Sequence, residues 1–485
     1  MNGPVFTQEE LERATQGRFT GPAAARAEGV STDTRTLAPG ACFVALRGER
    51  FDGHDHLPEA QQAGAACAVV EEGRAAALAA GLARLDQGNG SPGLAGAGLP
   101  LLAVKDTLAA LGALARFHRR RFRIPVVGVT GSNGKTTTRE MVAAILATRG
   151  PVLRTEGNLN NEVGVPLTLF RLGAEHDAAV IEMGMSHPGE IRRLACIAEP
   201  QVGVVTNATA AHLEGLGSVD GVADAKAELW AGLPPGGIAV ANADDPRMLK
   251  RAQASGKRVL TFASGRGRRG DVVALDLLSH GPEGLAFTLG IGNRELEVRL
   301  PLVGLHNMAN AAAAAAAAVA LGCSDREIVA GLAQVRTVGR RLRLEELPSG
   351  VLLVDDCYNA NPASMQAALE TLSQLAAERG GRPVAVLGDM LELGAAEEPS
   401  HRALGEQAAR AGLKLLAAFG PRSRTTLAAA RAAGLAEAAS LHTEDLGELA
   451  REVRARLAPG DVLLVKGSRG NRLERLVEAL NERRP

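Results

Sequence analysis

Eight short apolar runs, each followed by a helical pattern, are the feature that most constrains the fold of this chain. They are Val126–Val129, Ala178–Ile181, Val202–Val205, Ile238–Ala241, Val351–Val354, Val384–Leu387, Leu415–Phe419 and Val462–Val465. Short apolar runs that alternate with helices are typical of parallel strands covered by helices on both faces. The order therefore predicts an α/β protein with one parallel sheet in the middle of the chain and a second in its last third.

The length of 485 residues predicts about three domains. We place a small α/β domain at 1–123, a central domain with a parallel sheet at 124–338, and a Rossmann-like α/β domain at 339–485. Within the first domain, 41–46 and 66–70 are predicted strands, and 108–121 is a predicted helix. The Gly-rich stretch 87–98 has no periodicity and is a predicted exposed loop.

Composition excludes several classes of protein. Lys+Arg and Asp+Glu both number 54, so nothing favours a nucleic-acid or membrane-surface binder. The five cysteines are scattered and odd in number, which indicates reduced thiols. The start of the chain lacks the basic and apolar regions of a signal peptide. The alanine run Ala311–Ala318 is predicted to be a tightly packed internal helix, because alanine is small and favours helix. We expect a cytoplasmic protein, and a monomer by default.

The segment 128–138, Gly-Val-Thr-Gly-Ser-Asn-Gly-Lys-Thr-Thr-Thr, follows an apolar run and opens a helical pattern. Glycines let the backbone wrap closely around an anion, and the free N–H groups of a helix N-terminus point at it. The first glycine of the common phosphate-loop pattern is displaced, since Val129 stands at its position. Lys135 would reach the β- and γ-phosphates and the Thr136 hydroxyl would hold magnesium. The residues predicted to surround ATP are Gly131, Ser132, Asn133, Gly134, Lys135, Thr136 and Thr137; the alternative is a glycine-rich turn.

Two ligand-type side chains follow other apolar runs. Glu182 comes directly after 178–181, and His212 lies a few residues after 202–205. In a parallel sheet these positions share the carboxyl edge, where ligands bind, with the phosphate loop. Magnesium prefers oxygen ligands, so His212 would be a minority ligand beside Glu182 and the phosphates. The alternatives are a solvated strand end for Glu182 and a helix-cap or core histidine for His212.

Lys226 lies in a predicted helix, 219–230, with Val222 and Leu229 on the same face. A free ammonium is costly near an apolar face, and burial favours the neutral amine. Only the neutral amine reacts with carbon dioxide, to give an anionic carbamate able to hold a metal. The alternative, which the spacing alone favours, is a lysine that extends to water or pairs with Asp224 or Glu228.

Taken together, these residues resemble the Mur ligase family, whose members build the peptide of bacterial cell-wall precursors. The resemblance covers essentially the whole chain and includes the displaced glycine of the phosphate loop. Glu182 and His212 match magnesium ligands of the family, and Lys226 matches a lysine that is carbamylated in relatives. The resemblance implies catalytic roles for Lys135, Glu182, His212, Lys226 and Arg340, and metal ligation by Thr136, Glu182, His212 and carbamylated Lys226.

Three further motifs imply nucleotide contacts. The segment 306–311, His-Asn-Met-Ala-Asn-Ala, resembles a family motif that opens a helix near the adenine, with Asn310 as the contact. Gly339-Arg340-Arg341 resembles the Gly-Arg at the entry to the last domain, which implies that Arg340 reaches the nucleotide phosphates. Asp356 follows Asp355 at the end of a predicted strand and would bind the ribose hydroxyls.

Other motifs imply substrate contacts. The segments 31–35 and 51–55 look like a uridine-diphosphate region, 157–166 resembles the loop for a muramoyl-peptide arm, and 356–362 resembles a signature of the last domain. The segments 386–394 and 466–469 also fit, whereas Gly470-Asn471 departs from relatives and receives no functional weight. The implied substrate-binding residues are Ser31, Thr32, Asp33, Arg35, Asp52, Gly53, His54, Asn158, Asn161, Tyr358, Asn359, Asn361, Lys466 and Arg469. The local alternatives are a charged turn at Asp33 and Arg35, a helix cap at Asn361-Pro362, and a solvated loop at Lys466 and Arg469.

The resemblance implies an amide ligase of peptidoglycan synthesis that uses ATP and Mg²⁺. It would join D-alanyl-D-alanine to UDP-N-acetylmuramoyl-tripeptide through an acyl phosphate, and so serve cell-wall growth, cell shape and division. A folylpolyglutamate-type ligase shares the central loop and lysine, but it lacks a separate uridine-binding section. A plain P-loop NTPase and an inactive scaffold are further alternatives. The sequence leaves open the third residue of the tripeptide, the carbamylation of Lys226 and the arrangement of the domains.

Overall fold

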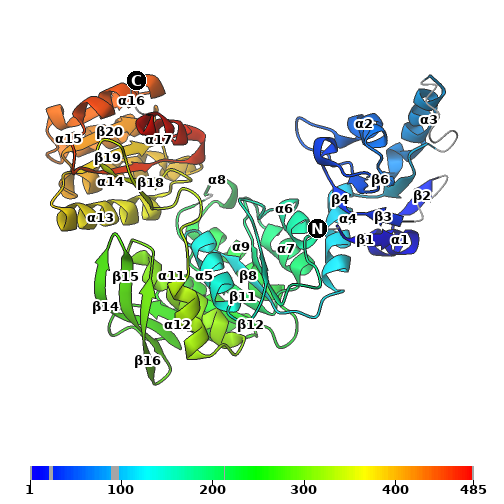
Figure 1. Cartoon of the computed structure of the whole chain (residues 1–485), viewed down its shortest axis with the longest axis horizontal. Helices are drawn as coiled ribbons and strands as arrows, with labels where there is room; N and C mark the ends of the chain where they lie inside the picture. Colours follow the sequence, from blue (N-terminus) through cyan, green and yellow to red (C-terminus); the bar gives the residue numbers. More distant parts are fainter. Residues whose placement is uncertain (1–2, 21–25, 89–97, 212, 483–485) are drawn as a thin grey trace. The chain divides into compact units, whose positions relative to one another are not determined.

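The computed structural model describes residues 3–20, 26–88, 98–211 and 213–482 (Figure 1). Its contacts divide the chain into two units. The first comprises Met1–Gly128, Pro151–Gly184 and Arg192–Pro200, and the second comprises Val129–Gly150, Met185–Ile191 and Gln201–Pro485. The domain boundaries at 123/124 and 338/339 stay predictions.

The N-terminal part of the first unit holds two sheets. Strands β1 and β3 form an antiparallel pair, and a second sheet has the order β2-β7-β6-β5-β4, with β4 to β7 parallel and β2 antiparallel to β7. The strands are β1 (Val5–Thr7), β2 (Arg18–Thr20), β3 (Arg26–Glu28), β4 (Val30–Ser31), β5 (Cys42–Val44), β6 (Cys67–Glu71) and β7 (Leu101–Val104). The helices are α1 (Gln8–Thr15), α2 (Leu57–Gln62), α3 (Glu72–Gly88) and α4 (Thr107–Arg119). The predicted loop at 87–98 is wrong at its start, because Gln87 and Gly88 end α3; residues 89–97 lie outside the described residues.

The central sheet has nine strands in the order β16-β15-β14-β13-β12-β11-β8-β10-β9, and β8 contributes residues to both units. Its strands are β8 (Val126–Thr130), β9 (Val152–Arg154), β10 (Ala178–Glu182), β11 (Val202–Val205), β12 (Ile238–Asn242), β13 (Arg258–Ser264), β14 (Val272–Gly281), β15 (Gly284–Ile291) and β16 (Arg294–Leu300). Strands β11 to β14 pair in parallel, as do β9 and β10. The prediction of a purely parallel sheet is wrong at one edge, since β14, β15 and β16 pair antiparallel. These three strands were not recognised because their alternating pattern has no intervening helix.

Eight helices are described between β8 and the last sheet. They are α5 (Lys135–Leu146), α6 (Gly164–Leu169), α7 (Glu190–Ala198), α8 (Leu213–Leu216), α9 (Val219–Ala231), α10 (Pro246–Ala254), α11 (His306–Ala320) and α12 (Asp325–Ala333). The predicted internal helix is confirmed, because every residue of Ala311–Ala318 is fully buried within α11. This helix packs on α5 and on strands β11 to β15, and its alanines allow that close approach.

The last sheet has the order β17-β18-β22-β19-β20-β21, parallel except for β17. Its strands are β17 (Arg343–Glu346), β18 (Leu352–Asp356), β19 (Pro383–Gly388), β20 (Leu415–Phe419), β21 (Ser440–Thr443) and β22 (Val462–Lys466). Its helices are α13 (Pro362–Arg379), α14 (Glu397–Arg410), α15 (Ser423–Ala432), α16 (Leu446–Arg456) and α17 (Glu474–Asn481). A buried apolar cluster lies on each face, so the predicted Rossmann-like α/β arrangement is confirmed. Because β22 lies between β18 and β19, the carboxyl ends of these three strands are neighbours.

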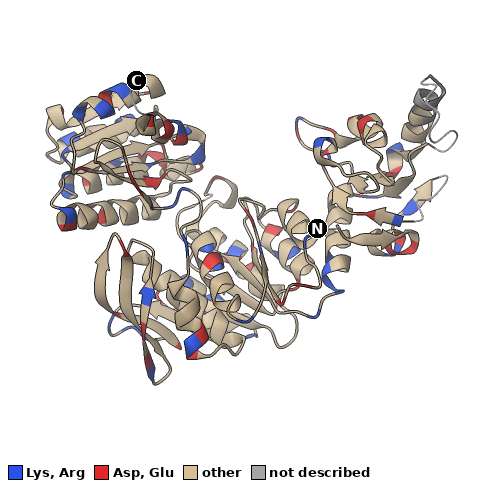
Figure 2. Cartoon of the chain, in the orientation of Figure 1, with Lys and Arg blue, Asp and Glu red and all other residues tan. Residues whose placement is uncertain are grey.

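All eight predicted apolar runs are strands, and most extend one or two residues further. Glu182 is therefore the last residue of β10 rather than the first one after it. Figure 2 shows basic and acidic residues interspersed along the described chain, in keeping with their equal numbers. Among the described residues, no helix combines the length and the apolar character needed to cross a bilayer.

Candidate active site

The loop between β8 and α5 is shaped by two glycines at positive φ. Gly131 has φ +152° and Gly134 has φ +80°. A Cβ atom on Gly131 would lie 1.7 Å from Thr206 Oγ1, and one on Gly134 would lie 2.2 Å from Asn310 Oδ1. Only glycine fits at these positions, since a side chain would clash and would also strain the backbone. The loop can therefore approach an anion closely, as the sequence predicts.

The residues after β11 hold this loop from one side. The N–H of Ser132 donates to the carbonyl of Asn207 at 3.0 Å, and the N–H of Asn133 donates to Asn207 Oδ1 at 3.0 Å. The Thr206 hydroxyl donates to the carbonyl of Asn133 at 2.5 Å. Contacts within the protein at the carboxyl end of β11 thus fix the backbone of the loop, which lowers the ordering cost of binding.

The cation of the loop lies at the start of α5. Lys135 Nζ donates to the carbonyls of Gly131 and Ser132 at 2.6 and 3.2 Å. The neighbouring Thr136 is buried. An ammonium folded over its own loop, next to a helix N-terminus, marks a place that favours negative charge.

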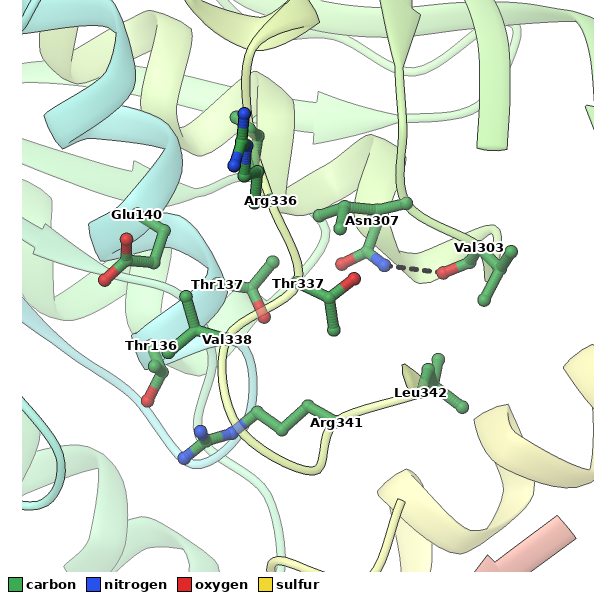
Figure 3. A pocket seen from close by; sticks show the side chains of 12 residues that line it. Thr136, Thr137, Glu140, Val303, Asn307, Arg336, Thr337, Val338, Arg341 and Leu342 are labelled. Carbon is green, nitrogen blue, oxygen red and sulfur yellow. Dashed lines mark hydrogen bonds between the residues drawn. The ribbon is translucent and has the colours of Figure 1, made fainter. Parts of the chain in front are cut away.

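Next to the loop lies a hollow formed by α5, the start of α11 and the segment before β17 (Figure 3). Thr136 and Thr137 line it on one side, and Asn307 and Arg341 line it on others. In Figure 3 the Arg341 side chain extends toward the side of the hollow where Thr136 lies. The full lining is Thr136, Thr137, Glu140, Leu302, Val303, Asn307, Val335, Arg336, Thr337, Val338, Arg341 and Leu342. Five of these twelve residues are apolar and seven are polar or charged, and a hollow with both kinds of side chain beside a phosphate loop fits a nucleobase and sugar.

Asn310, the predicted adenine contact, lies one helical turn away from this lining. Its Nδ2 donates to Asn307 Oδ1 at 2.8 Å, and Asn307 in turn donates to the carbonyl of Val303 at 2.7 Å. The sequence prediction missed Asn307, which lines the hollow itself. The i, i+3 spacing of the two asparagines on one helix was the signal for a pair that acts together.

Two consecutive arginines have different surroundings. Arg340, the predicted phosphate contact, donates to Asp355 at 3.0 Å and to Glu478 at 3.1 Å. Arg341 lines the hollow, and its guanidinium carbon lies 3.8 Å from the ring centre of Tyr358. Of the two, only Arg341 has its charge at the hollow. The sequence pattern Gly-Arg-Arg did not distinguish them.

Lys226 is buried in α9, with 2% of its surface exposed. Within the described part of the chain it has no hydrogen bond and no ion pair. Asp224 pairs with Arg251 instead, and Glu228 accepts from the N–H of Gly189, so the alternative of a solvated or paired lysine is wrong. Burial lowers the pKa of Lys226 well below its usual value, and the charge of Lys135 lowers it further. The neutral amine that the sequence argument requires is thereby favoured.

Glu182 lies at the end of β10 and is 2% exposed. Its carboxylate accepts from Asn160 Nδ2 at 2.9 Å, and its N–H donates to the Thr155 hydroxyl at 2.9 Å. Asn160 was missed by the sequence analysis, although it lies in the quoted segment 157–166. The described residues contain no cluster of three His, Cys, Asp or Glu side chains. His212 lies outside the described residues.

The segment 157–166 ends in a capping turn. Asn161 Oδ1 accepts from the N–H groups of Val163 and Gly164, at 3.3 and 2.8 Å, at the start of α6. The carbonyl of Asn158 accepts from the N–H of Asn160 at 2.8 Å. These bonds give the turn its shape, and the same turn brings Asn160 to Glu182.

The motif 31–35 forms an exposed turn after β4. Asp33 caps a short 3-10 helix, Thr34–Thr36, and the Arg35 guanidinium donates to its carboxylate at 2.9 and 2.6 Å. Ser31 Oγ donates to the carbonyl of Asp33 at 3.0 Å, and Thr32 lies between them. The hydrogen bond from Arg35 lowers the pKa of Asp33 to about 2. With 86% of its side chain exposed, Arg35 is accessible to a ligand.

The motif 51–55 is built into the fold more firmly. His54 is 1% exposed, its Nδ1 lies 2.7 Å from Asp52 Oδ1, and its Nε2 accepts from the N–H of Glu71 at 3.0 Å. Arg74 donates to the other carboxylate oxygen of Asp52. A Cβ on Gly53 would lie 2.8 Å from backbone atoms of Leu46. Both ring nitrogens of His54 make contacts within the protein, so its side chain stabilises the turn 51–55 against the end of β6.

At the carboxyl end of β18 and β22, Asp356 and Lys466 form a buried ion pair. Lys466 Nζ lies 2.6 Å from Asp356 Oδ2 and also donates to the carbonyl of Asn359 at 3.0 Å. Burial raises the pKa of the Asp356 carboxyl, and the Lys466 ammonium opposes this shift. Arg469 is exposed two residues after Gly467, at the start of a 3-10 turn. Asp356, the predicted ribose contact, and Lys466, a predicted substrate contact, therefore lie together and bind each other.

Asn471, to which the sequence analysis gave no weight, connects two of the quoted segments. Its Oδ1 accepts from the N–H of Asp389 at 3.0 Å, and its Nδ2 donates to the carbonyls of Asp389 and Ser468 at 2.9 and 2.8 Å. These bonds tie the turn after β19 to the turn after β22. A departure from relatives can therefore carry a structural role of its own.

Sequence models of three Mur ligase domains match the chain. They are described as "Mur ligase family, catalytic domain" at residues 26–119, "Mur ligase middle domain" at 129–318, and "Mur ligase, glutamate ligase domain" at 339–469. Together they match more than half of the chain, in the order that the three-domain prediction requires.

Named relatives and solved structures agree with these models. The UDP-N-acetylmuramoyl-tripeptide--D-alanyl-D-alanine ligase of Escherichia coli is 42% identical over 459 residues, which are 94% of each chain. A crystal structure of MurF from Acinetobacter baumannii is similar over all of both chains, with a TM-score of 0.86 and 32% identity. MurF ligase from Thermotoga maritima in complex with ADP covers 93% of this chain and 96% of its own, with a TM-score of 0.78 and 30% identity.

Proposed function

Because the chain belongs to the Mur ligase family, we propose that it joins D-alanyl-D-alanine to UDP-N-acetylmuramoyl-tripeptide and forms UDP-N-acetylmuramoyl-pentapeptide. The reaction consumes ATP and releases ADP and phosphate. The observation that carries this proposal is the 42% identity, over 94% of both chains, to the E. coli ligase of that name. The product would serve peptidoglycan synthesis in the cytoplasm.

ATP is the nucleotide that the site fits. The two positive-φ glycines and Lys135 accommodate phosphates, and the hollow beside Thr137 and Asn307 has the character of a base and sugar site. The T. maritima relative was solved with ADP, which supports the same use here. Arg340 stays a predicted phosphate contact, and we propose Arg341 as a second phosphate-neutralising residue, since Arg341 lines the hollow.

The reaction overcomes the poor reactivity of a carboxylate. The tripeptide carboxylate attacks the γ-phosphorus of ATP, ADP leaves, and an acyl phosphate forms. The amine of D-alanyl-D-alanine then attacks the acyl carbon, loses a proton, and phosphate leaves. Both reactants of the first step are anionic, so Lys135 and Arg341 promote it by positioning and by charge neutralisation.

Magnesium fits the donors that the chain offers. The Thr136 hydroxyl and the Glu182 carboxylate are the oxygen ligands that Mg²⁺ prefers, and we propose His212 as a further ligand. Glu182 suits this role because its carboxylate is buried and already oriented by Asn160. The bound ion would neutralise charge on the nucleotide phosphates.

Lys226 is proposed to carry a carbamate. Its neutral Nζ attacks the carbon of CO₂, a C–N bond forms, and one proton leaves to solvent. The burial of Lys226 and its lack of a partner among the described residues support this step. Incubation with ¹³C-bicarbonate is expected to give a carbamate NMR signal in the native protein and none in Lys226→Arg. A signal of equal size in the variant would contradict the proposal.

The proposed substrate contacts lie in both units. The exposed turn with Asp33 and Arg35 is a site for the uridine diphosphate, and the carboxyl end of β22, with Arg469, is a site for the dipeptide. His54 and Asp52 support the first of these from within the fold. We propose a monomer, and the identity of the third residue of the tripeptide is left to experiment.

The test is phosphate release from ATP with UDP-muramoyl tripeptide, with and without D-alanyl-D-alanine. Release that needs both substrates, together with a UDP-pentapeptide product, is the expected result. Tripeptides with diaminopimelate or lysine at the third position then identify the natural substrate. Release that is equal without the dipeptide, or acceptance of glutamate on a folate instead, would contradict the proposal.

Lys135→Met gives the matched test of the phosphate loop. Loss of the phosphate-binding ammonium is expected to lower kcat by about three orders of magnitude. The control is Lys414→Met, because Lys414 is an exposed lysine in the turn before β20. A similar loss in both variants would show that the assay reports a general effect of lysine removal.

A further inference from the structure

One amide side chain joins the start of α13 to the phosphate loop. Asn361 Nδ2 donates to Asn133 Oδ1 at 2.7 Å, and Asn361 Oδ1 accepts from the N–H of Ser364 at 2.9 Å. The same side chain therefore caps a helix and contacts a loop 228 residues earlier in the chain. We infer that Asn361 is a positioning residue that couples the phosphate loop to the turn 357–361, in addition to its predicted place near the substrate. This inference rests on the proposed ligase function.

On the loop side, the contact is made to a residue that cannot move alone. Asn133 donates through its N–H to Asn207 and through Nδ2 to Thr209 Oγ1, at 3.0 and 3.1 Å. Its carbonyl accepts from the Thr206 hydroxyl at 2.5 Å. Asn133 also lies directly before Gly134 and Lys135. A group bound to the Asn133 side chain therefore follows the position of the phosphate-binding backbone.

On the other side, the turn is attached to the remaining charged groups of the site. Lys466 donates to the carbonyl of Asn359 at 3.0 Å, and the N–H of Tyr358 donates to the carbonyl of Arg340 at 3.2 Å. The Tyr358 ring lies under the guanidinium of Arg341, which lines the hollow. The turn thus carries Lys466 on one flank and Arg341 on the other. Through its bond to Asn133, Asn361 connects the turn that carries both residues to the phosphate loop.

This arrangement predicts a specific kinetic signature. When the contact is lost, the three substrates still find their own binding groups, but Arg341 and Lys466 are no longer held in register with the phosphate loop. A loss of alignment lowers kcat more than it raises KM for the uridine substrate. A purely structural helix cap would instead lower the unfolding temperature and leave kcat unchanged.

Asn361→Ser separates the two roles. Serine caps a helix about as well as asparagine, but its hydroxyl is too short to reach Asn133. We expect kcat to fall about three- to tenfold, the effect of one lost hydrogen bond, with little change in the unfolding temperature. The matched control is Asp445→Ser, because Asp445 caps α16 through the N–H of Glu448 at 2.7 Å in the same sheet region. This control is expected to keep its kcat.

A double-mutant cycle with Asn133→Ala gives the decisive measurement. If the two side chains act through their mutual contact, kcat of the double variant is expected to fall no further than kcat of the more impaired single variant. The inference would be overturned if the fold losses in kcat of the two single variants multiply in the double variant, or if Asn361→Ser keeps the native kcat. Either result would leave the ligase assignment intact. The same cycle read on the Kd for ATP, by calorimetry without the other substrates, tests the coupling even if phosphate release shows a different ligase activity.

Discussion

Two regions of this molecule carry charged pairs at or just after the carboxyl ends of strands, and the two pairs differ in their exposure to solvent. After β4, Asp33 and Arg35 pair in solvent, with 37% and 86% of their side chains exposed. At the last residues of β18 and β22, Asp356 and Lys466 pair inside the protein, with 12% and 3% of their side chains exposed. The local sequences do not distinguish the two cases.

The difference shows what each pair can do. An exposed pair contributes little to stability, so its groups are free to exchange their mutual contact for a ligand. A buried pair depends on its partner, because one charge left alone in the interior is costly. The exposed pair is therefore suited to bind a substrate directly, and the buried pair to hold the carboxyl end of its sheet in shape. Lys226 is a third case, a buried amine with no partner among the described residues.

The largest effect is expected from Lys466→Met. Methionine has a similar volume but leaves Asp356 buried without its cation. The free energy of unfolding is expected to fall by about 3–5 kcal/mol, measured by urea unfolding followed by circular dichroism. The double variant Asp356→Leu with Lys466→Met is expected to regain most of this stability but no ligase activity. If the double variant is no more stable than the single one, the two residues do not depend on each other.

A smaller loss of unfolding free energy, about 2 kcal/mol, is expected from His54→Ala, because the Asp52 carboxylate and the N–H of Glu71 lose their hydrogen bonds to the buried ring. His56→Ala, in the same turn, is the control because that ring is more exposed.

Burial raises the pKa of Asp52, but hydrogen bonds from His54 and Arg74 outweigh this effect and bring the pKa to about 2. The folded pKa lies below the unfolded one, so this contribution is present above about pH 4 and is lost as the pH falls through 2. Equal acid sensitivity of Asp52→Asn and the native protein would contradict it.

Lys226→Met is expected to change stability in the opposite direction. Replacing a buried, unpartnered amine by an apolar chain should stabilise the metal- and bicarbonate-free protein by about 1–2 kcal/mol while abolishing ligation. The pKa of Lys226 is lowered in the folded state, so the unfolded chain binds more protons below the usual lysine pKa. The gain in the variant is therefore expected to be largest at low pH and to shrink as the pH rises toward 10. A gain independent of pH would contradict the burial of an ionisable amine.

The smallest effect on stability is expected from Asp33→Asn. The midpoint of thermal unfolding should stay within the error of the measurement, because the pair with Arg35 is solvated. KM for the uridine substrate should rise several-fold if this turn binds the diphosphate. Glu28→Gln, which disrupts the similarly exposed pair with Arg26 on β3, is the matched control and is expected to change neither quantity. A native KM in Asp33→Asn would mean that the turn is only a surface ion pair.

The sequence by itself determined the elements and the chemistry of the central loop. Short apolar runs such as 415–419, each followed by a helical pattern, predict buried strands, and the Gly-rich segment 128–138 predicts a backbone that wraps around an anion. These features are local, because periodicity and backbone conformation depend on neighbours in the chain. The antiparallel edge formed by β14 to β16 was not predicted from the sequence, because the pairing of strands in a sheet depends on partners outside each strand.

Only the tertiary structure decided which residue of a motif faces which partner. Arg340 and Arg341 are adjacent and chemically identical, yet one pairs with Asp355 and the other lines the hollow. Asn361 reads as a helix cap in the sequence, and its second contact, to Asn133, is made by a residue far away in the chain. Side-chain direction and burial depend on packing between segments far apart in the chain. For that reason the sequence motifs indicated which kinds of side chains form the site, and only the fold showed which of these side chains contact one another.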